Sequence, residues 1–235
     1  MVIWKRVNMF TIQQLPPQID PELLGLLEQA EPATIGHFLD FGFVDPAVRA
    51  MFDVPRIAGT AVTVRFTGAD CTILHYALGQ VRPGDVLVVD RAGDNRHGAV
   101  GGGVAFAAKA AGVKGLVMDG MATDIAELRE HRLPVWARGL STVTGKRLFQ
   151  QGEFCVPINC GGVPVSPGDA VLADENGVLI LKPEQIRAAA SRAIKMQREE
   201  QERMPDIAAG RRLPELNGTN ERLREIVTAQ KARQG

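Results

Sequence analysis

A series of short, β-branched runs between positions 57 and 181 restricts the fold more than any other feature of the sequence. The runs read IAGTAVTV, DVLVVD, GLVMD, PVWARG, VPINC and AVLADENGVLIL, and they are bounded by Gly, Pro or Asp. Runs of this length and composition predict β-strands. DVLVVD and GLVMD are apolar throughout rather than alternating, which is typical of strands buried on both faces. We therefore expect these two strands at the centre of a sheet.

Helical patterns alternate with the strands. Asp20, Pro21 and Glu22 read as an N-cap followed by proline at the first helical position, opening PELLGLLEQA. Further helices are predicted over 34–41, in ADCTILHYALGQV, over 102–111, in DIAELREH and in the amphipathic PEQIRAAASRAIKMQREEQERM. The alternation predicts a mixed α/β fold. We expect one domain over 1–204 and a helical arm over 205–235, where Pro, Gly and Asn precede a last charged helix.

Charge, hydropathy and cysteine content exclude several classes of protein. The chain has 27 Lys and Arg against 27 Asp and Glu, so a strongly basic nucleic-acid surface is not expected. It contains no run of about 18 apolar residues, and its first residues lack the apolar core of a signal peptide. We therefore expect a cytoplasmic protein without a membrane partner. The three cysteines and four histidines show no ligand spacing, which argues against a disulfide scaffold and a structural zinc site.

The densest glycine cluster lies in a strand, loop and helix segment, DVLVVD-RAGDNRHGAVGGG-VAFAAKAAG. Free N–H groups at the helix start near Gly101, Gly102 and Gly103 suit a carboxylate or a phosphate, because glycines let the backbone approach a ligand closely. The alternative is a tight turn with close packing of the helix on the sheet. The cluster fits neither the dinucleotide-binding nor the P-loop spacing. His97, in the same loop, is a candidate proton carrier or an exposed histidine without function.

A second candidate site follows the strand GLVMD. The segment GLVMDGMATDIAEL places Asp119 and Asp124 at the carboxyl end of this strand, where open α/β sheets bind ligands. A carboxylate there is a candidate ligand for Mg²⁺. Alternatively, Asp124 caps the next helix, because Glu127 follows three residues later as in a capping box. The two roles do not exclude each other.

Several segments in this order resemble a known family, that of the regulator of ribonuclease activity A (RraA) and the 4-hydroxy-4-methyl-2-oxoglutarate aldolases. The segments are VRPGDVLVVD, KAAGVKGLVMDGMATDIAEL, PVWARG and VPINCGGVPVSPGDAVLADENGVLIL. The resemblance spans about 34–203, and CGGVPVSPGDAVLADENGVLIL is its most specific stretch. It implies an αββα sandwich of the swivelling-domain type, assembled as a homotrimer or a hexamer with active sites between subunits.

The resemblance also implies a chemistry. The catalytic members are class II aldolases, in which Mg²⁺ or Mn²⁺ polarises a 2-oxo acid and stabilises the pyruvate enolate formed when a carbon–carbon bond breaks. Carried over by position, Asp124 would bind the metal, and Glu199 would reach the metal of a neighbouring subunit through water. The backbone amides that would hold the pyruvyl carboxylate are those of Gly101, Gly102, Gly103 and Val104.

Two positions depart from the aldolase pattern. The aldolases that this chain resembles have the motif D-G-x-x-R-D, and Thr123 stands at the position of its arginine. A hydroxyl cannot make the bidentate contact that a guanidinium makes with a carboxylate. Gly102 stands where the aldolases often have an acid. Arg91 or Arg96 would have to substitute for the missing arginine.

Three functions therefore follow from the resemblance. The favoured one is a metal-dependent lyase that cleaves substrates like 4-hydroxy-4-methyl-2-oxoglutarate to pyruvate or decarboxylates oxaloacetate. The second is a noncatalytic regulator of the ribonuclease E type. The third is an enzyme whose substrate has changed because Thr123 replaces the arginine.

Overall fold

The computed structural model describes residues 9–233. Its helices are α1 (Pro21–Glu28), α2 (Pro32–Ile35), α3 (Thr72–Leu78), α4 (Gly102–Ala110), α5 (Ile125–His131), α6 (Ile186–Ala208), α7 (Leu213–Leu216) and α8 (Thr219–Ala232), with a 3₁₀ turn over Pro183–Gln185. Its strands are β1 (Met9–Ile12), β2 (Arg49–Ala50), β3 (Ile57–Arg65), β4 (Asp85–Asp90), β5 (Gly98–Val100), β6 (Gly115–Ala122), β7 (Val135–Leu140), β8 (Gln151–Phe154), β9 (Ile158–Cys160), β10 (Val163–Val165), β11 (Ala170–Asp174) and β12 (Gly177–Leu181).

The predicted central strands form the middle of the main sheet. Strands β3, β4, β6 and β7 are parallel neighbours in the order β1-β8-β3-β4-β6-β7-β2. All six residues of β4, the run DVLVVD, are buried. GLVMD opens β6, which lies directly between β4 and β7. The prediction that both runs are central strands is confirmed.

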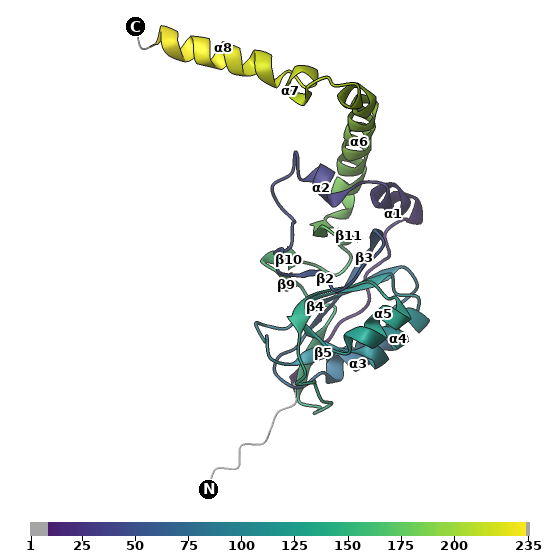
Figure 1. The fold of residues 1–235 in the computed structure, drawn as a ribbon. Coiled ribbons are helices and arrows are strands. Elements are labelled where there is room, and N and C mark those ends of the chain that lie inside the picture. The colour runs from purple at the N-terminus through teal and green to yellow at the C-terminus, as the bar shows by residue number, and fades with distance from the viewer. Residues whose placement is uncertain (1–8, 234–235) are drawn as a thin grey trace.

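The two faces of this sheet meet different layers (Figure 1). On one face, apolar residues of β4 and β6 pack against α3, α4 and α5, and this contact includes Leu87, Val89, Leu116, Met118, Val104, Ala108 and Leu128. On the other face, the same strands meet the inner side of the β11–β12 hairpin, through Val86, Val88, Val117, Val171, Ala173, Val178 and Ile180. The outer side of the hairpin packs against α1 and α6, through Leu172, Leu179, Leu181, Leu27, Ile186 and Ala190. These contacts make an αββα arrangement, as the resemblance implied.

A predicted strand and a predicted helix have different bounds in the structure. The run AVLADENGVLIL is not one strand but the antiparallel hairpin β11–β12, which turns at Glu175 and Asn176. The Asp174 side chain stabilises this turn, because its Oδ1 accepts a hydrogen bond from Asn176 N–H at 2.8 Å. The helix expected over 34–41 is the shorter α2, which ends at Ile35.

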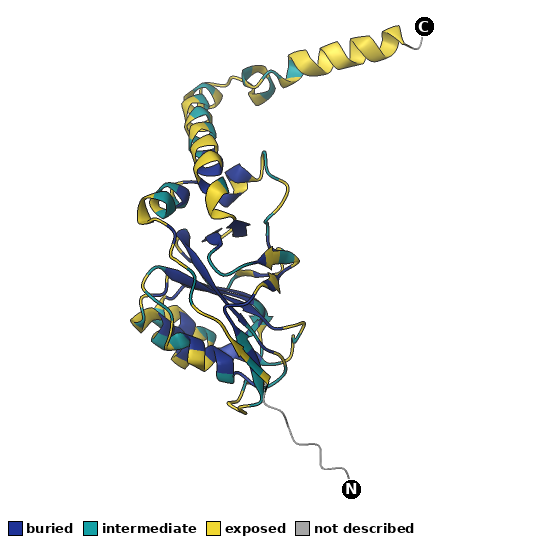
Figure 2. Cartoon of the chain, turned by 180° about the vertical axis from the view of Figure 1, so that it is seen from behind, coloured by how far each residue is buried: buried dark blue, intermediate teal, exposed yellow. Residues whose placement is uncertain are grey.

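The C-terminal part leaves the body of the molecule. Helix α6 packs against the hairpin at its start, and α7 and α8 continue beyond its far end (Figure 1). No residue of α8 is buried, and the helix is drawn as exposed along its length (Figure 2). The boundary predicted between 204 and 205 falls inside α6, which runs through Pro205. Within residues 9–233, no helix is both long and apolar enough to cross a membrane.

Candidate functional site

The glycine-rich loop and the end of β6 lie side by side because of strand pairing. β5 pairs with β6 in parallel, with Gly98 opposite Met121 and Val100 opposite Ala122. Thr123 N–H then donates to the Val100 carbonyl at 2.9 Å. This register brings Gly101, the residue before α4, next to Thr123 and Asp124, which are more than twenty positions away in the chain. The two candidate sites expected from the sequence are therefore one site.

Asp124 faces the start of α4 rather than its own helix. Its backbone is left-handed, with φ of 53°, and its side chain makes no capping hydrogen bond to α5. Asp124 Oδ2 instead accepts from Gly102 N–H at 3.2 Å, and Oδ1 accepts from the Thr123 hydroxyl at 3.1 Å. The capping-box alternative is therefore wrong, because the left-handed backbone turns the carboxylate away from the first turn of α5.

Two glycines make room for two carboxylates. A Cβ on Gly101 would collide with the Asp124 carboxylate, and a Cβ on Gly102 would collide with the Glu127 side chain. Gly103, one position further, has open space at the same place. A side chain at 101 or 102 would therefore displace these carboxylates, while one at 103 would not. Glu127, which the sequence suggested only as a capping partner, lies over the start of α4.

A cavity of about 410 Å³ opens beside these carboxylates. It is lined by residues 123–127 and 140–142. Its polar side chains are the carboxylates of Asp124 and Glu127 and the hydroxyls of Thr123, Ser141 and Thr142. The lining contains no basic side chain.

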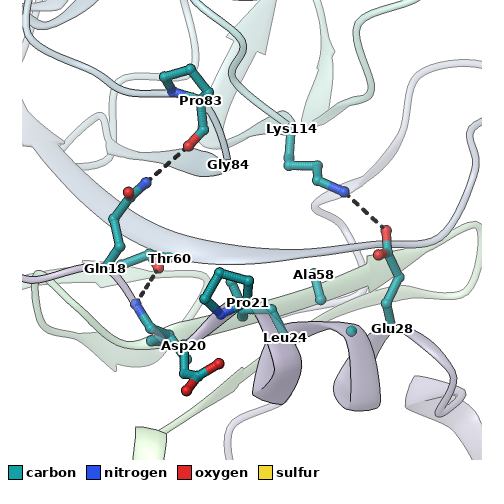
Figure 3. Close-up of a pocket in the computed structure, with 12 residues that line it drawn as sticks. Gln18, Asp20, Pro21, Leu24, Glu28, Ala58, Thr60, Pro83, Gly84 and Lys114 are labelled. Carbon is teal, nitrogen blue, oxygen red and sulfur yellow. Dashed lines mark hydrogen bonds and ion pairs between the residues drawn. The ribbon is translucent and has the colours of Figure 1, made fainter.

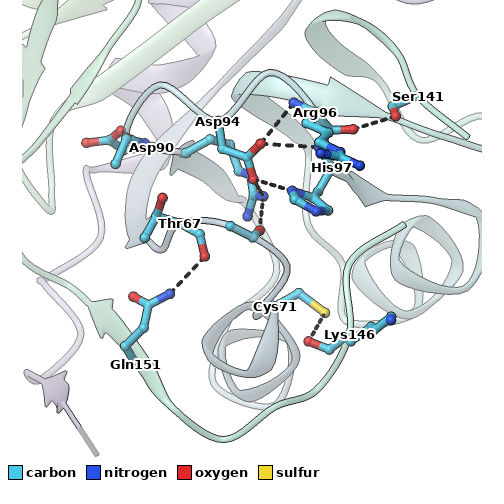
Figure 4. A network of polar contacts seen from close by, with 12 residues as sticks. Thr67, Cys71, Asp90, Asp94, Arg96, His97, Ser141, Lys146 and Gln151 are labelled. Carbon is cyan, nitrogen blue, oxygen red and sulfur yellow. Dashed lines mark hydrogen bonds and ion pairs between the residues drawn. The ribbon is translucent and has the colours of Figure 1, made fainter. Parts of the chain in front are cut away.

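The loop before β5 is organised around Asp94 (Figure 4). Its carboxylate accepts from Arg91 Nη2 at 2.7 Å and from Arg96 N–H at 2.9 Å, and it lies 2.9 Å from His97 Nδ1. Burial alone would raise the pKa of Asp94, but the hydrogen bonds from Arg96 and His97 and the charge of Arg91 outweigh it and lower that pKa. Asp94 is therefore ionised at neutral pH, and it orients the His97 ring.

The two candidate substitute arginines are placed differently. Arg91 is fully buried, donates to the Gly68 carbonyl at 2.7 Å and stacks 4.1 Å from the centre of the Phe66 ring. Burial lowers the pKa of its guanidinium, and its side chain fills the space above Gly120. Arg91 thus holds the loop and does not line the cavity. Arg96 is exposed, and its carbonyl accepts from the Ser141 hydroxyl at the cavity rim at 2.6 Å.

Asp119 and Cys71 lie away from this site. Asp119 bonds the Arg138 side chain and accepts from Gly161 N–H at 2.7 Å, so its carboxylate ties β6 and β7 to the loop after β9. Cys71 is buried at the start of α3, its thiol donates to the Lys146 carbonyl at 3.2 Å, and burial raises its pKa. These placements fit structural roles for both residues.

Glu199 is not brought to Asp124 within this chain. It lies on α6, which occupies the opposite end of the molecule from α5 (Figure 1). There it pairs with Lys195 at 3.7 Å and with Arg203 at 3.9 Å, and it lines another cavity near α2. The metal role given to Glu199 stays a prediction that needs a second copy of the chain.

The carboxylates at the start of α4 can be compared with the ligand sets of known metal ions. Within residues 9–233, no three His, Cys, Asp or Glu side chains converge as a ligand set. Mg²⁺ commonly uses one or two carboxylates and fills its other positions with water and substrate oxygens. Asp124 is exposed and each of its oxygens accepts one hydrogen bond, so lone pairs remain on both. The donor set fits a water-rich magnesium or manganese site and does not fit a zinc site.

A second pocket lies beside α1 (Figure 3). It measures about 320 Å³ and is bridged at one end by Lys114 and Glu28, whose charged atoms are 3.5 Å apart. Gln18 closes another side by donating to the Pro83 carbonyl at 2.9 Å. None of its lining residues belongs to the site at the start of α4.

Comparison with known proteins places this geometry in a family. The sequence profile of the RraA-like family, described as Aldolase/RraA, matches residues 37–180. A relative from Halalkalibacterium halodurans, provisionally named 4-hydroxy-4-methyl-2-oxoglutarate aldolase, is 31% identical over 66% of this chain and 74% of its own length. The 4-hydroxy-4-methyl-2-oxoglutarate aldolase of Thermus thermophilus is 36% identical over 54% of this chain and 76% of its own.

A solved structure has the same fold. RraAS2 of Streptomyces coelicolor, described as an unusual member of the RNase ES inhibitor RraA protein family, superposes with a TM-score of 0.70. It is 27% identical, and the match covers 80% of this chain and 99% of RraAS2. The profile match extends over β3 to β12, which include the Gly101–Asp124 site and the hairpin. By sequence and by fold, the chain belongs to the RraA-like family of aldolases and RraA proteins.

Proposed function

We propose that this protein is a divalent-metal-dependent carbon–carbon lyase that acts on 2-oxo acids. The observation that carries the proposal is that the pairing of β5 with β6 places the Asp124 carboxylate beside the start of α4, next to a cavity that Asp124 lines. Within the described residues, the N–H groups of Gly103 and Val104 have no hydrogen-bond partner. They can therefore bind a substrate carboxylate, which the positive end of the α4 dipole also favours. The aldolase names of the relatives support the same reaction class.

Each residue of the site has a distinct task in this proposal. Asp124, held by Gly102 N–H and by the Thr123 hydroxyl, would hold Mg²⁺ or Mn²⁺. The bound metal would polarise the 2-oxo group and stabilise negative charge that develops when the carbon–carbon bond breaks. His97 would carry a proton, because donation from Nδ1 to Asp94 leaves Nε2 as an acceptor. Arg96 lies in the same loop, and its backbone carbonyl is bonded to the Ser141 hydroxyl at the cavity rim, so it is a candidate for the missing cation.

The test is pyruvate release by the purified protein. 4-Hydroxy-4-methyl-2-oxoglutarate, oxaloacetate and 4-hydroxy-2-oxopentanoate are incubated with Mg²⁺ or Mn²⁺, and pyruvate is measured. We expect release from at least one compound, its loss on addition of EDTA, and a decrease of about 10²–10³-fold in Asp124→Asn. Asp40→Asn, a change at an exposed carboxylate away from the site, is the control. Absence of metal-dependent pyruvate from all three compounds would contradict the proposal.

We further propose that the protein assembles as a homotrimer or hexamer in which Glu199 approaches a neighbouring site. The support is that Glu199, the second carboxylate that the resemblance assigns to the metal, does not approach Asp124 within one chain and stands on a helix that projects from the body. Light scattering after size-exclusion chromatography gives the assembly size. If the protein is assembled as proposed, Glu199→Gln weakens Mn²⁺ binding without changing that size. A monomer at micromolar concentration would contradict this proposal.

A regulator of the ribonuclease E type is the second candidate. The similarity to RraAS2 and the presence of Thr123 in place of the aldolase arginine favour it. If this candidate is correct, the protein inhibits cleavage by a ribonuclease E at micromolar concentration, and Asp124→Asn inhibits equally well. Failure to bind the ribonuclease at that concentration would exclude this function.

A further inference from the structure

His97 lies at the rim of the cavity that Thr123 and Ser141 line. Both of its neighbours in the chain are fixed there. The Arg96 carbonyl accepts a hydrogen bond from the Ser141 hydroxyl at 2.6 Å. Gly98 lies so close to Thr123 that a Cβ on this glycine would be 3.1 Å from Thr123 Cβ. The His97 side chain is 21% exposed, so a small molecule can contact its ring.

The His97 ring is held by Asp94 (Figure 4). Asp94 Oδ2 lies 2.9 Å from His97 Nδ1. Asp94 Oδ1 accepts hydrogen bonds from the backbone N–H groups of Arg96 at 2.9 Å and of His97 at 3.3 Å. An ionised carboxylate can only accept hydrogen bonds, so Nδ1 of the neutral ring carries the hydrogen. Nε2 is then left as an acceptor.

Arg91 holds the same carboxylate in an arrangement that contributes little to folding. Its side chain is fully buried, and its Nη2 donates to Asp94 Oδ2 and to the Gly68 carbonyl, in both cases at 2.7 Å. Its Nε and Nη1 are also buried, and neither has a hydrogen-bond partner among residues 9–233. A buried cation with unpaired N–H groups is a weak source of stability. What Arg91 does accomplish is to keep Asp94 in one orientation.

We propose that Arg91 and Asp94 are positioning residues, which hold the His97 ring with its proton on Nδ1 so that Nε2 can take a proton from a ligand at the cavity. The reaction that this serves rests on the proposed lyase function. When a 4-hydroxy-2-oxo acid is cleaved, Nε2 takes the proton of the 4-hydroxyl, whose carbon becomes a carbonyl. The electron pair of the broken C3–C4 bond enters the enolate of pyruvate. The same proton then passes from Nε2 to C3, which leaves His97 neutral again.

Nitrogen NMR of the histidine rings measures this positioning without a substrate. The protein is labelled with ¹⁵N-histidine and studied at about pH 8, where a histidine of ordinary pKa is neutral. His97→Gln identifies the His97 signals. We expect a protonated Nδ1 and an unprotonated Nε2 in the native protein. In Asp94→Asn the amide can donate to Nδ1, so the ring proton should move toward Nε2.

Asp45→Asn is the matched control for Asp94→Asn. Asp45 is likewise a loop carboxylate that accepts from a backbone N–H two residues later, that of Ala47 at 2.9 Å, and it pairs with Arg138 at 3.0 Å. It makes no contact with His97 among the hydrogen bonds and ion pairs of the described residues. Asp45→Asn should therefore leave the His97 signals unchanged.

The stability of a double variant separates positioning from a structural role. Replacing both members of a buried ion pair by uncharged groups is often neutral or stabilising. Arg91→Met combined with Asp94→Asn should therefore keep the urea midpoint of the native protein, while His97 loses its preference for Nδ1. The signals of the other three histidines show whether the fold is intact. A lower midpoint with an unchanged His97 tautomer would identify the pair as structural and overturn the inference.

Pyruvate release shows whether Asp94 acts through His97. We expect Asp94→Asn to lower the rate about 10- to 100-fold in the native protein, but less than about twofold in His97→Gln. Equal decreases in both backgrounds, or a proton on Nε2 in the native protein, overturn the inference whether or not the lyase proposal holds. If the NMR results are as expected but no compound yields pyruvate, the lyase proposal and the proton step fail, and the positioning of His97 is supported.

Discussion

At the scale of single residues, Asp70 illustrates how one carboxylate holds two segments together. It accepts hydrogen bonds from the backbone N–H groups of Thr72, Leu148, Gln150 and Gln151, and it is almost fully buried. Burial alone would raise the pKa of Asp70, but the hydrogen bonds outweigh it and lower the pKa to about 2. The start of α3 is thereby fastened to the loop before β8.

Asp70→Asn should lower the free energy of unfolding at pH 7 by about 1–3 kcal/mol, because an amide cannot accept all of these bonds on its two polar atoms. A carboxylate with a depressed pKa adds stability above the pKa of the unfolded chain, and this contribution is lost as pH falls toward the folded value. The native protein should therefore lose this part of its stability between about pH 4 and pH 2. Urea denaturation followed by circular dichroism tests this, with Asp40→Asn as the control. If the free energy of unfolding fell equally between pH 4 and pH 2 in Asp70→Asn and in Asp40→Asn, the role given to Asp70 would be wrong.

The glycines at the start of α4 provide a matched pair of substitutions. Gly103→Ala should stabilise the protein by about 0.5–1 kcal/mol, because its Cβ would meet open space and alanine favours the helix. Gly101→Ala should destabilise it by about 1–3 kcal/mol, since its Cβ would lie against Asp124 and Thr123. Thermal denaturation of both variants measures the difference. If Gly101→Ala were as stable as Gly103→Ala, the close approach of Asp124 described above would be wrong.

At the scale of elements, α6 and α8 differ in what they contribute to stability. The start of α6 is packed, with Ile186, Ala189 and Ala190 buried against the hairpin and α1, whereas α8 buries nothing. Most helical stability in proteins comes from such packing rather than from intrinsic propensity. The arm is therefore not part of the core of the single chain.

Removal of residues 211–235 should change the free energy of unfolding of the single chain by less than about 0.5 kcal/mol. Ala190→Asp, which places an unpaired charge in the packed part of α6, should cost about 3 kcal/mol or more. Urea denaturation of both proteins is the measurement. A large loss of stability on truncation, at a concentration where assembly is absent, would contradict the exposed placement of α8.

At the scale of the whole molecule, Trp136 adds a side-chain contact between the two β layers, which the antiparallel pairing of β11 with β3 also joins. This side chain of β7 is fully buried between the layers, and its Nε1–H donates to the Asp174 carbonyl of the hairpin at 2.7 Å. It belongs to the apolar contact that the inner side of the hairpin shares with β4 and β6. Trp136 therefore links the parallel sheet to the layer on which α1 and α6 rest.

Trp136→Ala should lower the free energy of unfolding by about 3–5 kcal/mol, because it leaves a cavity between the layers and an unpaired carbonyl. Trp136→Phe should lower the free energy of unfolding by less, since most of the side-chain volume is kept and mainly the hydrogen bond to the Asp174 carbonyl is lost. Phe106→Ala, at a side chain of α4 that is 60% exposed, is the control and should cost far less. Denaturant unfolding followed by far-UV circular dichroism gives these values. Similar stabilities of Trp136→Ala and Phe106→Ala would contradict the role of this contact.

Local patterns in the chain were enough to predict the α/β class, the central strands, the cap of α1 by Asp20 and the segments that mark the family. Such features depend on residue type and on spacing within a few positions, so they can be read along the sequence. The hairpin in 170–181 was missed because its apolar run continues on both sides of the turn. The helix that begins at the glycine cluster was predicted, but the distant residues that lie beside its first turn were not.

The composition of the site depends on tertiary structure. The pairing of β5 with β6 brings Gly101 and Asp124 together, and the left-handed backbone of Asp124 turns its carboxylate toward α4. Neither could be read from spacing, because strand register and a positive φ at a non-glycine residue are set by contacts between distant segments. For the same reason Glu127, seen in the sequence as part of a cap, lies over Gly102 at the cavity. The chain alone carries the glycines and the acids, and the fold brings them together at the start of α4.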